Sequence, residues 1–259
     1  MSDRRIETVV VDGVATVRLT RADKKNAMSL SMWRELAAVM GMLEAEAAVR
    51  AIILTGGDSC FSAGADISEF KDVRSTPSQV AAYEAEVDGA LAAISGMSKP
   101  TISAVSGACF GGGVALAAST DFRVADASAL FSVSAVHMGL VYNVAKCTRL
   151  YRLIGLTNAK LMLMTGARYD VAAAQRLGFV DIVADSAAAG AGDLAAQLCR
   201  GAPLAVAGLK AILDALGEDD IAARREKLER LIEQADASED HREAARAFAE
   251  KRLPVFQGR

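Results

Sequence analysis

Two loops of small residues each follow a run that is typical of a β-strand. Residues 61–67 (Phe-Ser-Ala-Gly-Ala-Asp-Ile) follow Ala51–Thr55, and Phe110 with three glycines follows Thr101–Val105. Small residues allow a ligand to reach backbone N–H groups. Two such donors aimed at one carbonyl oxygen stabilise the negative charge that develops there during attack or deprotonation. The two loops therefore predict an oxyanion-binding site.

Each loop is a weak signal by itself. A glycine triplet before a helix is equally typical of a tight turn, or of a helix that packs closely on a strand, as it is of a binding site. The N–H of Gly112 would also open a helix, where the helix dipole favours negative charge. Ala65 and Gly112 lie 47 residues apart, in this order, and each loop follows a β-run. This combination favours the functional interpretation.

Alternating strand and helix patterns predict the elements that position these loops. Asp12 and Gly13 between Ile6–Val11 and Val14–Leu19 predict a β-hairpin. Further strands are expected at Phe122–Ala125, 130–133 and 179–183. Helices are expected at 32–47 (capped by Ser29 or Ser31), 80–94, 112–119, 144–154, 158–164 and 171–177, with a mobile loop at 71–78. The pattern predicts an α/β fold.

The last quarter of the chain reads as helical. Residues 187–192 are alanines and glycines, which we expect to form a linker, and helical patterns follow at 193–200, 203–216, 221–235 and 239–252. This change predicts a boundary near residue 190, with a core at 1–190 that holds the site and a helical region at 191–259.

Composition excludes several classes of function. The chain has 259 residues, of which 52% are hydrophobic, and its net charge of −3 gives no basic field for nucleic acid. No apolar run is long enough to span a membrane. The four cysteines show no paired spacing, so we expect neither a disulfide framework nor a metal site. The start of the chain shows no signal peptide, and we expect a cytoplasmic protein.

The chain resembles the crotonase (enoyl-CoA hydratase/isomerase) superfamily over nearly its whole length. Besides the two loops, the resemblance rests on segments in the same order, at residues 21–27, 99–107, 119–121, 163–166, 174–180 and 247–252. It implies a crotonase-like spiral of strand-strand-helix turns, with an α-helical C-terminal trimerisation region. It also implies a homotrimer or hexamer that acts on CoA thioesters, as a lyase or isomerase of fatty acid metabolism.

The resemblance implies roles for individual residues. The N–H groups of Ala65 and Gly112 would form the oxyanion hole, and coenzyme A would be part of the substrate, with no permanently bound cofactor. The residues that would contact CoA are Lys24, Lys25, Ala63, Asp66, Ile67, Phe248 and Lys251, the last two from a neighbouring subunit. For the lysines, a solvated loop or helix face is the alternative.

Two departures from the family pattern concern the catalytic acid and base. Hydratases of this family carry one glutamate three residues after the middle glycine of the triplet and a second one four residues before a later glycine. Here these positions are Ala115 and Ala135. A positioned general acid or base contributes roughly 10²–10⁴-fold to a rate. The usual two-glutamate hydration is therefore disfavoured.

A few nearby residues are candidates to replace the glutamates or to line the acyl pocket. His137 lies two residues after Ala135, would face the same side in an extended segment, and has an unperturbed pKa of about 6.5 that suits acid–base work. A structural histidine bonded to backbone is the favoured alternative. Tyr142 and Asn143 are expected to line the acyl pocket with Ala115 and Ala135.

Three hypotheses about function follow. The first is an enzyme that processes acyl-CoA through a stabilised thioester enolate. Isomerisation and decarboxylation depend less on the two missing glutamates than hydration does. The second is a non-catalytic acyl-CoA binder. The third is RNA binding, shown by one branch of the superfamily through a lysine-rich helix. It is disfavoured here because the corresponding helix, residues 31–47, is acidic on balance.

Overall fold

The chain begins with a β-hairpin, as expected. The structure, a computed structural model, describes residues 5–217 and 221–259. Strands β1 (Ile6–Val11) and β2 (Val14–Leu19) pair antiparallel, and Asp12 and Gly13 both have positive φ angles, of 49° and 80°. A two-residue turn of this kind matches the twist of the strands that it joins. The predicted hairpin is confirmed.

A six-stranded sheet with the order β1-β2-β3-β5-β7-β10 forms the centre of the molecule, and its strands from β2 onward are parallel. The remaining members are β3 (Ala51–Thr55), β5 (Thr101–Val105), β7 (Phe122–Ala125) and β10 (Ile182–Val183). The first three of these match their predicted bounds. The strand expected at 179–183 is too long, because the N–H groups of Phe179 and Val180 instead bond Ala174 in a turn.

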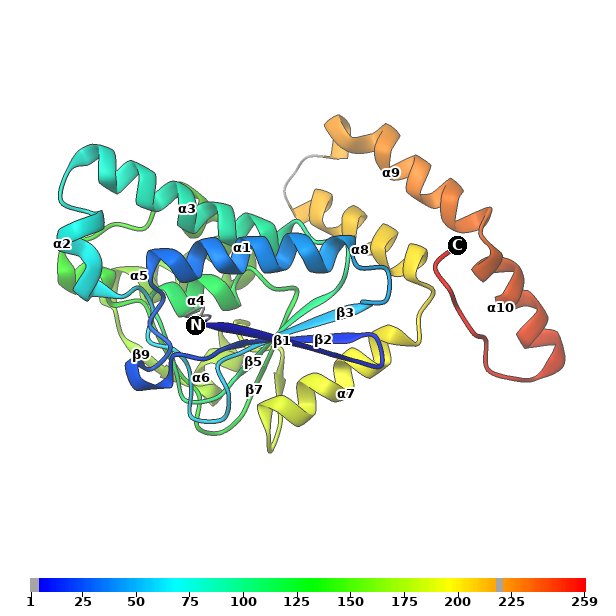
Figure 1. The fold of residues 1–259 in the computed structure, drawn as a ribbon, viewed down its shortest axis with the longest axis horizontal. Helices are drawn as coiled ribbons and strands as arrows, with labels where there is room; N and C mark the ends of the chain where they lie inside the picture. Colours follow the sequence, from blue (N-terminus) through cyan, green and yellow to red (C-terminus); the bar gives the residue numbers. More distant parts are fainter. Residues whose placement is uncertain (1–4, 218–220) are drawn as a thin grey trace.

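Helices cover both faces of this sheet (Figure 1). Ile52 and Leu54 of β3 join the core under α1 (Leu30–Ala45) and α3 (Pro77–Ser95), whereas Ile53 packs with α7 (Ala187–Cys199) on the other face. This division follows from the strand period of two, which sends successive side chains to opposite faces. Ser29 caps α1 by accepting a hydrogen bond from the Met32 N–H, so the first of the two candidate caps is the one used.

The linker expected at residues 187–192 is wrong, because these residues form the first turns of α7. Ser186 caps this helix by accepting from the Ala189 N–H, and Ala187, Ala191 and Ala195 are buried against the sheet. Alanine is the best helix former, and the spacing of four places the three alanines on one face. Residue 190 lies within α7. The division into units 1–190 and 191–259 stays a prediction.

A second, smaller sheet lies beside the first and carries the two loops. Its order is β4-β6-β8-β9, with β4 (Cys60–Ser62), β6 (Ala108–Phe110), β8 (Leu130–Ser132) and β9 (Arg168–Asp170). Strands of three residues leave almost no periodic signal, and only β8 was predicted. The first loop begins where β4 ends, and the glycine triplet begins where its neighbour β6 ends. The parallel pairing of β4 and β6 thus brings the loops together.

The other helices complete the shell around the sheets. They are α2 (Phe70–Val73), α4 (Gly112–Ala117), α5 (Val144–Thr165, kinked at Gly155), α6 (Val171–Arg176), α8 (Pro203–Gly217), α9 (Ile221–Asp236) and α10 (Glu239–Glu250). The loop expected at 71–78 is partly wrong. Residues up to Val73 are helical, and Pro77 opens α3 behind a capping box made by Thr76 and Gln79.

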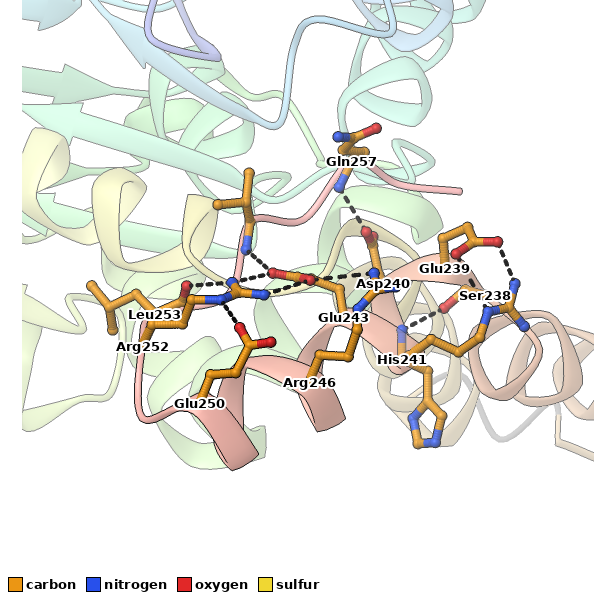
Figure 2. A network of polar contacts seen from close by, with 12 residues as sticks. Ser238, Glu239, Asp240, His241, Glu243, Arg246, Glu250, Arg252, Leu253 and Gln257 are labelled. Atoms are coloured by element: carbon orange, nitrogen blue, oxygen red, sulfur yellow. Dashed lines mark hydrogen bonds and ion pairs between the residues drawn. The ribbon is translucent and has the colours of Figure 1, made fainter.

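Helices α9 and α10 project away from the sheets (Figure 1), so the expected helical C-terminal region is present. Beyond α10 the tail returns along it. Asp240, which is buried, accepts hydrogen bonds from the N–H groups of Gln257 and Gly258, and Arg252 pairs with Glu243 and Glu250 (Figure 2). Among the residues described, no helix is both long and apolar enough to cross a bilayer.

Candidate active site

The two predicted loops lie against one another. Gly64 and Gly111 have positive φ angles, of 98° and 47°. A Cβ atom on Gly64 would lie 2.7 Å from the carbonyl oxygen of Phe110, so only glycine fits this approach. The first loop is held at both sides, because the Met28 N–H donates to Gly64 and the Asp66 N–H donates to Met28.

The N–H groups of Ala65 and Gly112 are close neighbours. A Cβ atom on Gly112 would lie 3.3 Å from the Ala65 nitrogen, and one on Gly64 would lie 3.1 Å from the Gly112 nitrogen. Gly112 is the first residue of α4, where an N–H has no partner within the helix. Within residues 5–217 and 221–259, we find neither group donating a hydrogen bond to the protein. Both are therefore free to donate to a ligand.

Both residues line one pocket of about 520 Å³, which includes solvent space at its mouth. The pocket gathers five of the residues that the sequence singled out, namely Ala65, Gly112, Ala115, Ala135 and Tyr142. Val87, Leu140 and Phe70 add apolar surface. Such a cavity, apolar with a few polar groups, is typical of a small-molecule site.

The expectation for His137 depended on an extended segment, and that premise is wrong. Residues Ser134–Met138 form a 3-10 helix, so the alternation that would align His137 with Ala135 does not apply. The His137 ring is exposed, lies close to Gly166, and is not among the residues that line the pocket. The geometry therefore gives no support to a catalytic role for this residue.

Asn143 does not line the pocket either. Its side-chain oxygen caps α5 by accepting from the Lys146 N–H, and its amide donates to Asp88 at 2.7 Å.

The residues expected to contact CoA lie outside the pocket. Lys24, Lys25 and Ile67 are exposed. Phe248, 87% exposed, and Lys251 lie on α10 and at its end. Their contacts with CoA stay predictions.

Asp66 has a local structural role. It is 7% exposed, pairs with Arg21 at 2.6 Å, and caps a short 3-10 helix by accepting from the Ser68 N–H. Burial raises the pKa of this carboxyl, but the hydrogen bonds from Ser68 and Arg21 outweigh burial and hold the pKa below its usual value.

Sequence reasoning missed a charged cluster that lines part of the pocket. Glu84 of α3 pairs with Arg74 at 2.7 Å and with Lys146 at 2.5 Å, and Lys146 also pairs with Asp88 at 3.1 Å. Arg74, Glu84 and Lys146 line the pocket. Glu84 and Asp88 are four residues apart and so share a helix face. That spacing was readable, but nothing in the sequence showed which face meets the site.

Several polar atoms around the pocket have no hydrogen-bond partner among the described residues. They are Trp33 Nε1, Arg74 Nε, Tyr83 Oη and Tyr142 Oη. Burial raises the pKa of Tyr83 to about 12 and also raises the pKa of Tyr142. Both phenols are thus neutral near pH 7 and can donate a hydrogen bond.

Comparison with known proteins agrees with this architecture. The sequence profile described as Enoyl-CoA hydratase/isomerase matches residues 10–259. The chain belongs to the enoyl-CoA hydratase/isomerase family. The superfamily expected from the sequence is thereby confirmed.

Named relatives and solved structures cover almost the whole chain of this family member. It is 32% identical to the mevalonyl-coenzyme A hydratase SIDH of Beauveria bassiana, over 94% of this chain and 91% of the relative. It is 30% identical to the enoyl-CoA isomerase/hydratase fer4 of Mycosarcoma maydis, over 95% of this chain and 93% of the relative. The structure of an enoyl-CoA hydratase/carnithine racemase from Magnetospirillum magneticum superposes with a TM-score of 0.94 at 32% identity. The match covers 100% of this chain and 97% of that structure's chain. The predicted α/β crotonase fold is confirmed.

Proposed function

We propose that this family member processes acyl-CoA thioesters, with the N–H groups of Ala65 and Gly112 as an oxyanion hole for a thioester enolate. The observation that carries the proposal is the pair of neighbouring backbone donors, free of protein partners, at an otherwise mostly apolar pocket. Donors fixed in advance at the place where charge develops need no reorganisation during the reaction.

The two alanines in the pocket disfavour hydration by the usual two-glutamate mechanism. Glu84 is the one carboxylate among the residues that line the pocket, but Arg74 holds its Oε1 and Lys146 its Oε2. A carboxylate with both oxygens bound to cations is poorly placed to take a proton from water. We assign Glu84 a positioning role for these two cations.

Isomerisation and decarboxylation fit the pocket better. Isomerisation needs one base, and decarboxylation needs none, because the enolate forms as carbon dioxide leaves. Tyr142 is a neutral hydroxyl at the oxyanion end of the pocket, since its Oη lies 4.0 Å from the position that a Cβ on Gly111 would take. It is suited to hydrogen-bond the acyl group.

The CoA portion would extend outward from the oxyanion hole. The backbone of residues 63–67 would receive the adenine end, and Lys24 or Lys25 would contact phosphates. Phe248 and Lys251 would contact CoA from a neighbouring subunit in a trimer or hexamer. A cytoplasmic location and a role in fatty acid metabolism complete the proposal.

Mass spectrometry of purified protein incubated with a set of thioesters tests the proposed chemistry. The set contains crotonyl-CoA, a 3-enoyl-CoA and methylmalonyl-CoA, and each product is compared with a no-protein control. We expect an isomer of the 3-enoyl ester or loss of carbon dioxide from methylmalonyl-CoA. Rapid hydration of crotonyl-CoA would contradict the proposal that hydration is disfavoured in this protein.

A non-catalytic acyl-CoA binder is the second candidate, because both alanines leave the oxyanion hole without an acid or base beside it. It predicts binding of thioesters, with neither a new mass nor a new isomer from any of them. Binding without turnover would replace the enzymatic proposal, and absence of both binding and turnover would exclude the two together.

A further inference from the structure

One wall of the pocket carries three buried hydrogen-bond donors, two of which have no acceptor in the described parts of the chain. They are Trp33 Nε1, Tyr83 Oη and Arg74 Nε, and we call these residues the donor wall. Trp33 is 1% exposed and Tyr83 is 5% exposed. A buried polar group without a partner costs about 1–3 kcal/mol. Two of them at one pocket indicate that a ligand supplies the missing oxygen.

The donor wall begins beside the oxyanion hole. Trp33 Cζ2 lies 3.2 Å from the position that a Cβ on Gly112 would take, so the indole adjoins the oxyanion hole. The indole N–H also lies near the Tyr83 hydroxyl oxygen, and this hydrogen-bonding contact opposes part of the effect of burial on the tyrosine pKa. The Tyr83 O–H and the Arg74 Nε–H are therefore the two donors left for a ligand. The Arg74 guanidinium lies 5.6 Å from the centroid of the Tyr83 ring. An acyl chain whose carbonyl oxygen sits in the hole would therefore pass along these donors.

The chemistry of the donor wall selects an acceptor. The indole N–H and the guanidinium Nε–H can only donate, and a phenol can donate as well as accept. Elsewhere in the pocket lining, Ala115, Ala135 and Leu140 offer no polar side-chain atom. A plain hydrocarbon chain would leave the Tyr83 hydroxyl and Arg74 Nε without an acceptor. A chain with an oxygen on one side would satisfy at least one of them.

The charges around the wall are already balanced. Arg74 pairs with Glu84, and Lys146 pairs with Glu84 and Asp88, so that two cations face two carboxylates. A carboxylate held at the donor wall would add an uncompensated buried charge, which is costly. The carboxylate of methylmalonyl-CoA is a different case, because it is on the α-carbon beside the thioester carbonyl and leaves as carbon dioxide. An uncharged oxygen carries no such penalty.

We propose that the donor wall selects acyl-CoA esters whose acyl chain carries an uncharged oxygen, as a hydroxyl or ketone, beyond the thioester carbonyl. This inference rests on the proposed function, because it takes the thioester to be held at Ala65 and Gly112. It adds a substrate class that the oxyanion hole alone does not specify.

Trp33 provides the test, because it is the only tryptophan of the chain and lines the pocket. Its fluorescence is titrated in the full-length protein with free CoA, butyryl-CoA, 3-hydroxybutyryl-CoA, 4-hydroxybutyryl-CoA and glutaryl-CoA. One net hydrogen bond of about 1 kcal/mol corresponds to about 5-fold in affinity. We expect at least one hydroxylated ester to bind about 5-fold more tightly than butyryl-CoA, and glutaryl-CoA to bind more weakly than that ester.

A matched pair of variants assigns the preference to the wall. Tyr83→Phe removes one hydroxyl, and we expect it to abolish the difference in affinity between the hydroxylated ester and butyryl-CoA. Tyr151→Phe removes a hydroxyl from a tyrosine that is 52% exposed on α5 and outside the pocket lining, and should keep the preference.

The remaining outcomes separate the two proposals. Equal affinity for butyryl and hydroxylated esters, tightest binding of glutaryl-CoA, or a preference that survives in Tyr83→Phe would each overturn the inference and leave the proposed function standing. No fluorescence response to any ester would overturn both.

Discussion

At the scale of single residues, the site depends on a glycine at position 112, because a Cβ atom there would crowd the oxyanion hole. A Cβ at position 112 would lie 3.3 Å from the Ala65 nitrogen and 3.2 Å from Trp33 Cζ2. We expect Gly112→Ala to obstruct the oxyanion hole and to reduce kcat by roughly 10²–10³-fold, the usual cost of one lost donor. Steady-state kinetics with the thioester that the mass-spectrometric set identifies would measure this.

The control for this substitution is Gly192→Ala on α7, where an added Cβ would have no neighbour within 4 Å. It makes the same chemical change away from the pocket, and kcat should remain that of the unaltered protein. Equal activity of the two variants would argue against an oxyanion hole at Gly112.

A second residue-scale prediction concerns Asp66, which holds the first loop to Arg21. Its pKa is lowered in the folded chain, so its stabilising contribution is present above the ordinary carboxyl pKa and is lost as the pH falls through the lowered value. We expect Asp66→Asn to lower the free energy of unfolding by about 1–3 kcal/mol at pH 6. Denaturant unfolding of both proteins should show this difference shrinking towards pH 3 and below. A difference that is independent of pH would contradict the assignment.

At the scale of elements, α7 provides the sharpest test of the fold. Gly190 and Gly192 both lie in it, but a Cβ on Gly190 would lie 2.7 Å from the Ala184 Cβ and 3.0 Å from Val124 Cγ1, whereas Gly192 has open space. We expect Gly190→Ala to destabilise the protein by about 1–3 kcal/mol through overpacking. We expect Gly192→Ala to stabilise it by about 0.5–1 kcal/mol through helix propensity. Denaturant unfolding at one protein concentration would measure both. Equal effects would mean that residues 187–192 do not pack as a helix on the sheet.

The same helix shows why part of the fold was beyond sequence reasoning. Strands such as β3 and β5 are buried apolar runs and were predicted with their bounds. Residues 187–192 read as a linker because alanine and glycine are common both in linkers and in closely packed helices. Here the contact with the sheet decides in favour of the helix. The short β4 and β6 were missed for a related reason, since pairing with neighbours defines them.

The candidate site was likewise predicted only in part. Ala65, Gly112, Ala115 and Ala135 were identified through motif spacing, which survives in the linear sequence. The donor wall was not, because Trp33, Arg74 and Tyr83 come from three helices with no shared motif. Arg74 lies at the C-cap of α2, and its place beside Tyr83 depends on a turn that the sequence presents as a loop.

At the scale of the whole molecule, exposed leucines on α8 indicate assembly. Leu209, Leu213 and Leu216 are between 59% and 64% exposed and share one helix face by their spacing. We expect a solution mass of three or six times the 27.0 kDa chain. Leu213→Glu should shift the mass towards the monomer. Light scattering coupled to gel filtration would measure both, and a monomeric unaltered protein at micromolar concentration would contradict the predicted oligomer.

The central claim is that two backbone donors hold the thioester carbonyl. Infrared difference spectroscopy of an acyl-CoA labelled with ¹³C at that carbonyl measures the effect of these donors on the bond, whether or not turnover follows. Hydrogen bonds from Ala65 and Gly112 polarise the carbonyl, so the account predicts a lower stretching frequency in the bound ester than in the free ester in water. A bound ester with an unshifted or higher carbonyl frequency would contradict it.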